Sequence, residues 1–488
     1  MKLLNDHGVN VSESDFKSDL KEALLAHLHR RKLIETCVNE EQLEKAIQTR
    51  KLGLYCGADP TAKSLHLGNL LPLMILLHFN IRGHNIFPLV GGATGAVGDP
   101  SGRNTERNAM SDNARLDHVK RIADQFLNFF STALKYSQSR NPLIEYAETG
   151  SRQLKDNYEW WKDMGMLEFL AMFGRYFRVN QMLARDSIKS RLLSEQGIGF
   201  NEFTYQILQA YDFYYLNKNF GVDIQVGGRD QYGNIVAGID LITRLGRHEE
   251  NKDQGLELDL EQESKSNLES QPSCYGLTVP LLTTASGVKF GKSAGNAIFI
   301  DRELTPSYEI YQFMYRTEDE DVQRFLYKFS MLPIPVIDRI VQAHDTDRKQ
   351  RFGQRVLAME MCDLIHGDGE GYDNELISKT LYSKELNIKF DTDELLRALK
   401  RQNMVTTLTR KQLAKTNATH LLFTLSKGAH SKSDFRRKIK SRAIIIGRNK
   451  KEKINAVDEI IKRNRLIDDK LLLLRAGKEY YIAEVVED

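Results

Sequence analysis

A histidine and an asparagine three residues apart could bind phosphate at the start of a helix. Residues 54–72 read LYCGADPTAKSLHLGNLLP, in which a short apolar run breaks at Gly57 before His66, Asn69 and a second apolar run. This order predicts a strand, a tight turn and a helix whose first turn carries both side chains on one face. A helix N-terminus favours phosphate, and Gly68 would let a planar ligand approach the backbone. Taken alone, the same residues also fit a simple helix cap.

Two lysines far along the chain form a second candidate phosphate site. Residues 289–293 read KFGKS and follow the strand-like run Leu277–Thr283. Two cations on a glycine-containing loop suit a polyphosphate, although a lone K-x-x-K is more often a solvated loop. The pair formed by His-x-Gly-Asn and K-x-G-K-S is much rarer than either motif alone.

Together the two segments resemble the signatures of the class I aminoacyl-tRNA synthetases. The similarity is closest to the tyrosyl-tRNA synthetases of bacterial and mitochondrial type, and it runs from about Lys51 to the C-terminus. It is carried by the stretches YCGADPTAKSLHLGN, LVGGATGAVGDPSGR, FTYQILQAYDF, IQVGGRDQYGNI and KFGKS. The resemblance implies a doubly wound nucleotide-binding fold that holds ATP between the two motifs. Composition and periodicity alone indicate only a large α/β enzyme that binds a nucleotide.

The elements that must position these residues fall into four segments. Residues 1–50 predict a helical lead-in. Residues 51–304 alternate strand-like and helical patterns, which predicts an α/β Rossmann-like catalytic domain with a doubly wound parallel sheet and ligands at the carboxyl ends of its strands. An acidic insertion within it, 249–272, is expected to be disordered. The resemblance assigns 305–385 to a helical tRNA-facing domain and 395–488 to a small α+β, basic RNA-binding domain.

The distribution of charge favours a nucleic-acid partner. The 488 residues carry a net charge of +3, but residues 401–488 hold 21 Lys and Arg against 10 Asp and Glu, and the first 400 residues sum to −8. A basic tail on a mildly acidic body is an electrostatic footprint for RNA, although solubility alone could also explain it. Four scattered cysteines without a C-x-x-C argue against a disulfide framework or a zinc site. The longest apolar run is too short to span a bilayer.

The resemblance also implies a reaction and the residues that perform it. The tyrosine carboxylate attacks the α-phosphate of ATP without a general base, and the adenylate then esterifies tRNA. Thr61 and His66 match donors to the leaving phosphates, and Asn69 stands where many members carry a second histidine. The remaining matches are cations that clamp pyrophosphate: Lys289 and Lys292 with Ser293 beside them in one loop, and Arg103 and Arg107 in a second loop, where Arg103 replaces a usual lysine.

Further matches line the adenylate. Cys56, Gly57 and Asp59 match the end of the first strand, and Gly228 with Asp230 matches a ribose-binding turn. The positions implied for ATP are therefore Cys56, Gly57, Asp59, His66, Gly68, Gly228, Asp230, Lys292 and Ser293. On its own, GGRDQ fits a glycine turn with a capping aspartate.

A third set of matches would select tyrosine. Tyr55 and Asp212 match the groups that bind the phenol hydroxyl, Gln231 matches a contact to the substrate carboxylate, and the α-ammonium is implied to lie against Asp99, Tyr205 and Gln209. Tyr205, Gln209 and Asp212 are spaced to share one helix face, which by itself would also fit a polar solvent-facing stripe.

Partners and compartment follow from the same resemblance. The implied ligands are L-tyrosine, ATP with Mg²⁺ and tRNA(Tyr), with no protein-bound metal or prosthetic group and no membrane, and a homodimer is implied. Arg436, Arg437, Lys438 and Lys440 lie on one predicted helix of the tail and could contact RNA phosphates. Chain length and insertions favour the mitochondrial matrix over a bacterial cytoplasm, although early acidic residues make the N-terminus a poor transit peptide. The alternatives are a tryptophanyl-tRNA synthetase and an RNA-binding or splicing protein derived from this fold.

Overall fold

A six-stranded sheet forms the centre of the first part of the molecule. The computed structural model describes residues 2–101, 110–193, 197–253, 274–287, 290, 292–293, 296–382, 390–447 and 452–488. The strand order is β1-β6-β5-β2-β3-β4, in which β6, β5, β2, β3 and β4 are parallel and β1 is antiparallel to β6. The strands are β1 Thr36–Val38, β2 Gly53–Ala58, β3 Asn85–Val90, β4 Lys155–Asp156, β5 Val222–Gly228 and β6 Tyr275–Val279.

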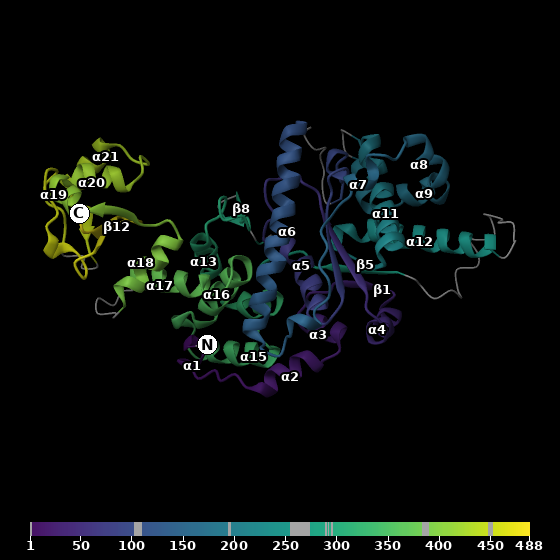
Figure 1. The fold of residues 1–488 in the computed structure, drawn as a ribbon, viewed down its shortest axis with the longest axis horizontal. Coiled ribbons are helices and arrows are strands. Elements are labelled where there is room, and N and C mark those ends of the chain that lie inside the picture. The colour runs from purple at the N-terminus through teal and green to yellow at the C-terminus, as the bar shows by residue number, and fades with distance from the viewer. Residues whose placement is uncertain are drawn as a thin grey trace. The chain divides into compact units, whose positions relative to one another are not determined.

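Helices cover both faces of this sheet, as Figure 1 shows. They are α5 Leu67–Asn80 and α6 Asp112–Arg140 on one side, and α11 Phe200–Phe220 and α12 Tyr232–Asp253 on the other. The sheet is buried between them, and β5 accordingly reads as a continuous apolar run that is buried from Val222 to Gly227. The expected doubly wound α/β fold is confirmed. The strand order reverses between β2 and β5, and such a switch point is where ligands bind in open parallel sheets.

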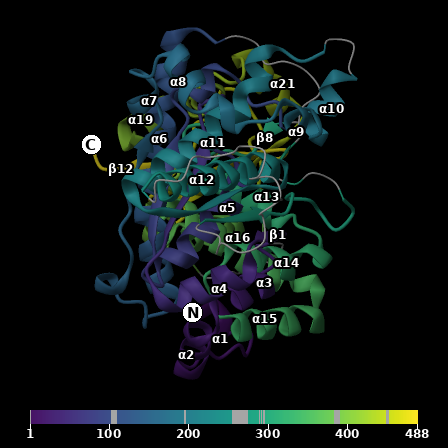
Figure 2. The ribbon, with the colours of Figure 1, turned by 90° about the vertical axis from the view of Figure 1, so that its right-hand side faces the viewer.

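The N-terminal 50 residues are built into this first part. They form α1 Lys2–Asn5, α2 Glu13–Lys21, α3 Leu24–Arg30 and α4 Glu40–Thr49, and they add the edge strand β1 to the expected helical lead-in. Arg31 is fully buried and donates to the backbone carbonyls of Ser330 (2.6 Å) and Leu332 (2.7 Å). α2 lies beside α15 Ile334–Thr346 in both views (Figures 1 and 2). The lead-in thereby attaches the helices after the sheet to the sheet itself.

The chain divides into two compact units within the helical segment expected at 305–385. Residues 1–305 and 312–368 form the first unit, and residues 306–311 and 369–488 form the second. In the first unit, α14 Asp319–Phe329 and α16 Phe352–His366 pack against α5 and α6, respectively. α17 Glu370–Tyr382 belongs to the second unit because Ile377 and Leu381 lie in its apolar core. The other short helices are α7 Tyr158–Trp161, α8 Met166–Met172, α9 Val179–Leu183, α10 Asp186–Leu192 and α13 Ser307–Tyr315.

The second unit is built on a four-stranded sheet in the order β10-β11-β12-β9. Its elements are α18 Thr392–Arg401, β9 Thr406–Thr409, α19 Arg410–Lys415, α20 Ala418–Leu425, α21 Lys432–Lys440, β10 Ile444–Ile446, β11 Leu471–Ala476 and β12 Glu479–Val486. Alternate leucines of β11 serve two cores: Leu472 and Leu474 pack with α20 and α21, whereas Leu471 and Leu473 pack with α17 and α18. Among the described residues, no helix is both long enough and apolar enough to cross a bilayer.

Candidate active site

The first turn of α5 orients His66. His66 caps the helix: its Nδ1 accepts from the backbone N–H of Gly68 (3.0 Å), and its own backbone N–H donates to Asn69 Oδ1 (3.0 Å). Because Nδ1 accepts, the ring proton lies on Nε2, the nitrogen that can donate to a phosphate. His66 therefore caps the helix and still keeps one ring N–H that can donate to a ligand. Asn69 keeps an amide N–H₂ group that can donate beside it.

Gly68 makes room for that imidazole. A Cβ at residue 68 would lie 2.9 Å from His66 Cε1 and 3.1 Å from His66 Nδ1. This close approach adds a second reason for glycine here, besides access of a ligand to the backbone. Thr61 lies in the turn before the helix, partly buried, and its backbone N–H donates to the carbonyl of Asp59 (2.8 Å).

The segment after KFGKS lies beside the His66 turn. The backbone N–H of Leu67 donates to the carbonyl of Ile298 (3.1 Å), and that of Ile300 donates to the carbonyl of Leu65 (3.0 Å). The strand pair β7 Lys292–Ser293 and β8 Asn296–Ala297 comes just before this contact. The segment that follows the second signature is thus adjacent to the first signature. Lys289, Arg103 and Arg107, and the side chains of Lys292 and Ser293, lie outside the described residues.

The carboxyl ends of β2 and β5 meet at the switch point of the sheet. Gly57, near the end of β2, is exposed, and a Cβ there would meet nothing closer than 3.7 Å. At the end of β5 a Cβ on Gly228 would lie 2.5 Å from Asp230 Oδ1, so glycine there leaves room for that exposed carboxylate in its present position. Cys56 is buried, and burial raises the pKa of its thiol to about 12, which keeps it neutral. An exposed carboxylate beside glycines can accept from ribose hydroxyls.

Asp59 is fixed from two sides. Its Oδ2 accepts from the hydroxyl of Tyr205 (2.8 Å), and its Oδ1 accepts from Thr94 Oγ1 (2.8 Å). A Cβ on Gly91 would come within 2.1 Å of Asp59 Oδ1, so the backbone of the loop after β3 closes on this carboxylate. Tyr205 therefore connects α11 to the loop after β2, and burial followed by the charge of Asp59 holds the pKa of its phenol well above the usual value.

Four polar side chains form one network between α11 and α12. Gln231 Nε2 donates to Asp99 Oδ2 (2.7 Å), Gln209 Nε2 donates to Gln231 Oε1 (3.1 Å), and Asn234 Nδ2 reaches both glutamine oxygens (3.1 Å each). Asp99 is buried, whereas Gln209 and Gln231 are partly buried. The structure thus brings together three of the predicted residues, and it adds Asn234. A buried carboxylate flanked by amide oxygens suits an ammonium group.

Asp212 lies at the buried end of this site. It is 2% exposed and accepts from Asn157 Nδ2 (2.9 Å), Trp160 Nε1 (2.8 Å) and Trp161 Nε1 (2.7 Å). Burial raises the pKa of its carboxyl to about 7, although the three donors act in the opposite direction. The Tyr55 hydroxyl nearby is buried and makes no hydrogen bond within the described part of the chain. A buried acceptor beside a buried hydroxyl without a partner suits a ligand that carries a phenol, because a phenol hydroxyl can both donate and accept a hydrogen bond.

Asn157, Trp160 and Trp161 were not foreseen from the sequence. They follow β4 in the stretch NYEWW, and they include both tryptophans of the chain. Asn157 is fully buried; its Nδ2 also donates to Thr94 Oγ1 (2.9 Å), and its Oδ1 accepts from the backbone N–H of Ala93 (2.8 Å). It thereby links Asp212 to the Asp59 side of the site. The only signal in the sequence is the adjacent pair of tryptophans, because no spacing relates this stretch to α11.

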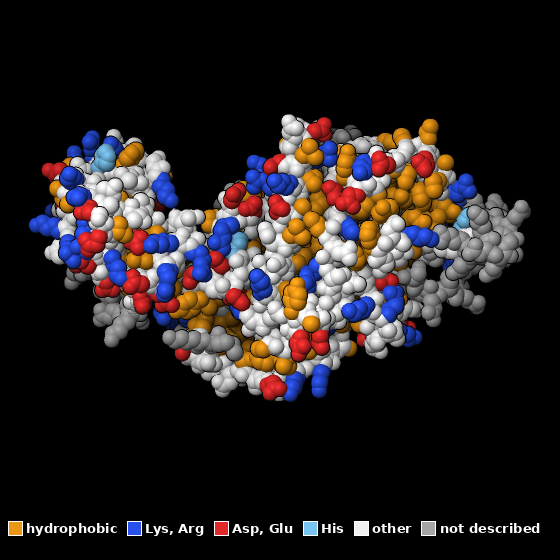
Figure 3. Space-filling view, in the orientation of Figure 1, with side chains coloured by type: hydrophobic (Ala, Val, Ile, Leu, Met, Phe, Trp, Pro, Cys, Tyr) orange, Lys and Arg blue, Asp and Glu red, His pale blue; other side chains and the backbone are white. Residues whose placement is uncertain are grey.

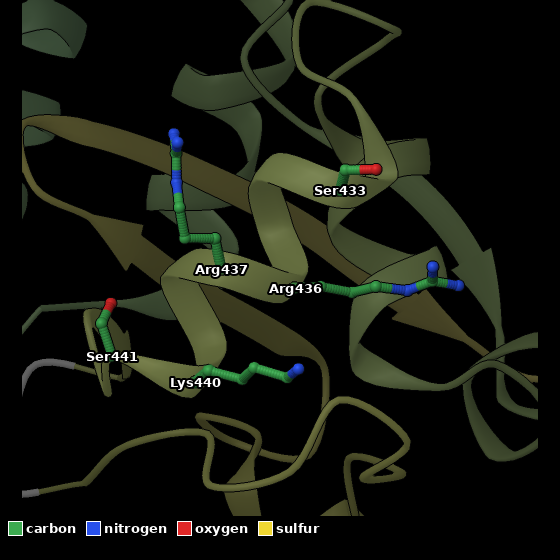
Figure 4. A pocket seen from close by; sticks show the side chains of 5 residues that line it. All are labelled: Ser433, Arg436, Arg437, Lys440 and Ser441. Atoms are coloured by element: carbon green, nitrogen blue, oxygen red, sulfur yellow. The ribbon is translucent and has the colours of Figure 1, made fainter.

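The predicted RNA-binding residues lie on α21. Phe435 and Ile439 are buried and anchor this helix. Arg436, Arg437 and Lys440 are exposed, and together with Ser433 and Ser441 they line a shallow hollow (Figure 4). Lys438 differs because it is partly buried and pairs with Asp434 (3.0 Å) and Glu479 (3.6 Å). Arg437 also pairs with Asp434 (2.6 Å), but it stays exposed, so Lys438 is the one of the four predicted cations that is both partly buried and paired within the unit.

A doubly wound sheet, with a capped His-x-Gly-Asn turn beside the segment that follows KFGKS, defines the chain as a class I aminoacyl-tRNA synthetase. The family model described as class I tRNA synthetases for tryptophan and tyrosine (W and Y) matches residues 47–382. The mitochondrial tyrosine–tRNA ligase of Saccharomyces cerevisiae is 43% identical over 471 residues, which are 96% of this chain and 89% of that protein. The tyrosine–tRNA ligase of Staphylococcus epidermidis is 36% identical and covers 94% and 98%.

Solved structures agree with these relatives. A C-terminally truncated mitochondrial tyrosyl-tRNA synthetase of Aspergillus nidulans is 32% identical, has a TM-score of 0.64, and covers 78% of this chain and 99% of that one. Its counterpart from Coccidioides posadasii is 34% identical, with a TM-score of 0.62 and coverage of 74% and 95%. The chain therefore belongs to the tyrosyl-tRNA synthetases of class I.

Proposed function

We propose that this protein joins L-tyrosine to tRNA(Tyr) in two steps at the site between β2, β5 and α11. In the first step, a carboxylate oxygen of tyrosine forms a bond to the α-phosphorus of ATP, and the bond to pyrophosphate breaks. In the second step, a hydroxyl of the terminal ribose of tRNA attacks the acyl carbon, and AMP leaves. A carboxylate is already a nucleophile, so catalysis needs orientation and charge stabilisation and no general base.

The observation that carries this proposal is the pairing of Tyr55 with Asp212. A carboxylate has about four lone-pair sites, and the donors Asn157, Trp160 and Trp161 use three of those on Asp212. One site on Oδ2 remains to accept the phenol proton of the substrate, and the Tyr55 hydroxyl can donate to the phenol oxygen. An indole N–H could donate to Asp212, but an indole offers no oxygen to accept from the Tyr55 hydroxyl, which disfavours tryptophan as the substrate.

The residues that would bind the phosphates of ATP start from the first turn of α5. The Nε2 proton of His66 and the Asn69 amide point from a helix N-terminus, where donors and dipole favour the charge that develops on the leaving pyrophosphate. We assign Thr61, Lys289, Lys292, Arg103 and Arg107 to the same task. Magnesium would arrive with ATP and neutralise phosphate charge. On the ribose side we assign Asp230.

Transfer to tRNA would use the second unit. Arg436, Arg437 and Lys440 form an exposed cationic face on α21, which suits contacts to RNA phosphates that position the substrate without reading its bases (Figure 4). Retention of the donor set at the catalytic site disfavours an RNA-binding or splicing protein that lacks catalysis.

A homodimer in the mitochondrial matrix completes the proposal. Hydrophobic side chains gather on the surface over α8 and α9 (Figure 3), where Met166, Leu167, Met172 and Val179 are each more than half exposed. Such a patch is typical of an interface, and twofold dimers are the commonest closed assembly. The compartment is supported by the likeness to the mitochondrial enzymes of three fungi.

Pyrophosphate exchange tests this function. We expect the purified chain to exchange labelled pyrophosphate into ATP with tyrosine alone among the twenty amino acids, and to charge tRNA(Tyr). Exchange supported by tryptophan would assign the chain to the other branch of its family. Tyrosine exchange without transfer to tRNA(Tyr) would contradict the second step.

A further inference from the structure

Both tryptophans of the chain donate to one oxygen of one carboxylate. Trp160 Nε1 lies 2.8 Å and Trp161 Nε1 lies 2.7 Å from Asp212 Oδ1, whereas Asn157 Nδ2 lies 2.9 Å from Oδ2. An sp² oxygen offers two lone-pair sites. Oδ1 is therefore saturated by protein donors, and Oδ2 is the only oxygen that can accept another hydrogen bond.

Aromatic side chains of α11 and α8 fix the two indoles. Trp160 stacks on Tyr215 (centroids 4.5 Å apart, 19° between planes), and Trp161 packs against Tyr211 (4.9 Å) and Phe169 (5.2 Å). Tyr211 and Tyr215 lie on the same helix as Asp212. The side chains that hold the two indoles therefore share one helix with the carboxylate that the indoles bind. Trp160 is buried in the core, whereas Trp161 is only partly buried.

We propose that Trp161 is a positioning residue for tyrosine selection, because its N–H occupies the second site of Asp212 Oδ1 and so directs the substrate phenol to Oδ2. This inference rests on the proposed function. Without this N–H, Oδ1 would be a second free acceptor. The substrate phenol could then donate to either oxygen of Asp212 and would bind in two different positions. Trp160 belongs to the buried core, whereas Trp161 is partly buried and packs against that core, so replacing Trp161 should disturb the core less.

The pH at which the Asp212 carboxyl ionises reports on this role, because it depends on the groups that surround the carboxyl. The groups that act on it are Tyr55 from β2, Asp59 after β2, and Tyr205 and Tyr211 from α11. These groups are neutral or anionic, so the N–H donors are what opposes the effect of burial on the carboxyl. Loss of one donor favours the protonated form, which is uncharged and therefore accepts the phenol proton at Oδ2 much more weakly. The acid limb of the tyrosine kcat/KM profile would therefore move to higher pH.

The test measures tyrosine-dependent pyrophosphate exchange by Trp161→Phe in the full-length protein. We expect the KM for tyrosine to rise about tenfold, the value of one hydrogen bond to a charged group, with kcat and the KM for ATP unchanged. We expect the acid limb to move up by about one pH unit. The preference for tyrosine over phenylalanine should fall by a similar factor.

Two further variants separate the donor from the ring. Benzothienylalanine at position 161 keeps the indole shape without the N–H, and it should reproduce the changes of Trp161→Phe even if the phenylalanine variant folds poorly. Phe169→Leu trims a ring that packs on Trp161 and removes no donor, so it should lower Tm and leave the acid limb in place. An unchanged acid limb and an unchanged tyrosine preference in the benzothienyl variant would overturn the inference. Absence of tyrosine exchange in the wild type would instead reject the proposed function.

Discussion

The two sheets of this molecule place their functional groups in opposite ways. The six-stranded sheet of the first unit has polar residues at the carboxyl ends of its parallel strands, and Asp99 in a loop and Asp212 on α11 are almost completely buried. The sheet of the second unit packs apolar cores against both faces, and the cations predicted to contact RNA lie outside the sheet, on α21. A small substrate is enclosed and is recognised by a few buried polar groups. An RNA backbone is instead bound on an open surface by many exposed cations.

This difference has an energetic consequence. In the first unit, polar groups share partners, as Gln231 does with Asp99, Gln209 and Asn234, so removing one leaves others unpaired in a poorly solvated site. On α21, Arg436 and Lys440 are solvated. Substitutions should therefore have large, coupled effects in the first unit and small, additive effects in the second.

Asp212→Asn should produce the largest effect. The variant removes the charged acceptor and turns an amide toward three N–H donors, so we expect kcat/KM for tyrosine to fall roughly 10²–10³-fold while the KM for ATP stays the same. Steady-state exchange measures both. Equal losses for tyrosine and ATP would place Asp212 outside the tyrosine pocket.

The pH profile of the wild type should report the same carboxyl. Its pKa is raised to about 7, and the ionised form accepts the phenol proton, so kcat/KM for tyrosine should rise as pH increases through about 7. In Asp212→Asn this limb should be absent. A wild-type profile that is flat through neutral pH would contradict the assignment of Asp212 as the acceptor.

Removal of the second unit should separate the two chemical steps. A chain cut after Asp368 ends where the first unit ends, so we expect tyrosine exchange to persist while charging of tRNA falls roughly a hundredfold. A cut after Leu395 is the matched control: it leaves Ile377 and Leu381 without the core they share with β11. That longer chain should aggregate more readily, although it keeps more residues. Loss of exchange on cutting after Asp368 would mean that the second unit supports the first fold.

Single cations of α21 should have smaller effects. Arg436→Gln should weaken tRNA binding several-fold and lower the slope of log K against log salt by about one. Lys438→Gln is the control, because Lys438 is paired with Asp434 and Glu479 and should change that slope less. Filter binding at several salt concentrations measures both. Equal slopes in the two variants would show that pairing within the unit does not decide which cation meets the phosphate.

Much of this arrangement can be predicted from the sequence where signals are local. The Gly57 break, the cap residues His66 and Asn69, and the spacing of Tyr205, Gln209 and Asp212 each depend on neighbours in one turn or helix. The doubly wound fold follows from the alternation of strands and helices. The adjacency of residues 65–67 and 298–300 required the family resemblance, because no local pattern encodes a contact between segments so far apart.

Other features depend on tertiary contacts that leave no periodic signal. Asn157, Trp160 and Trp161 meet Asp212 because the segment that follows the edge strand β4 packs against α11. The boundary after Asp368 depends on Ile377 and Leu381, whose helical spacing is the same whichever unit they pack against. Lys438 looks identical to its neighbours in sequence, and only the fold brings Glu479 beside it.

Gly68→Ala offers the finest test of how tightly the first unit is built. The new Cβ would lie 2.9 Å from His66 Cε1, so the imidazole must turn away and weaken its bond from the Gly68 N–H. A side chain displaced from its rotamer costs about 0.5–1.5 kcal/mol, so kcat for tyrosine exchange should fall roughly 2- to 10-fold with the KM for tyrosine unchanged. Gly246→Ala, where nothing lies within 4 Å of the added Cβ, is the matched control and should leave kcat as it is. If Gly68→Ala raised the KM for ATP and left kcat intact, glycine would serve there to admit the nucleotide, and the orientation of His66 would not depend on it.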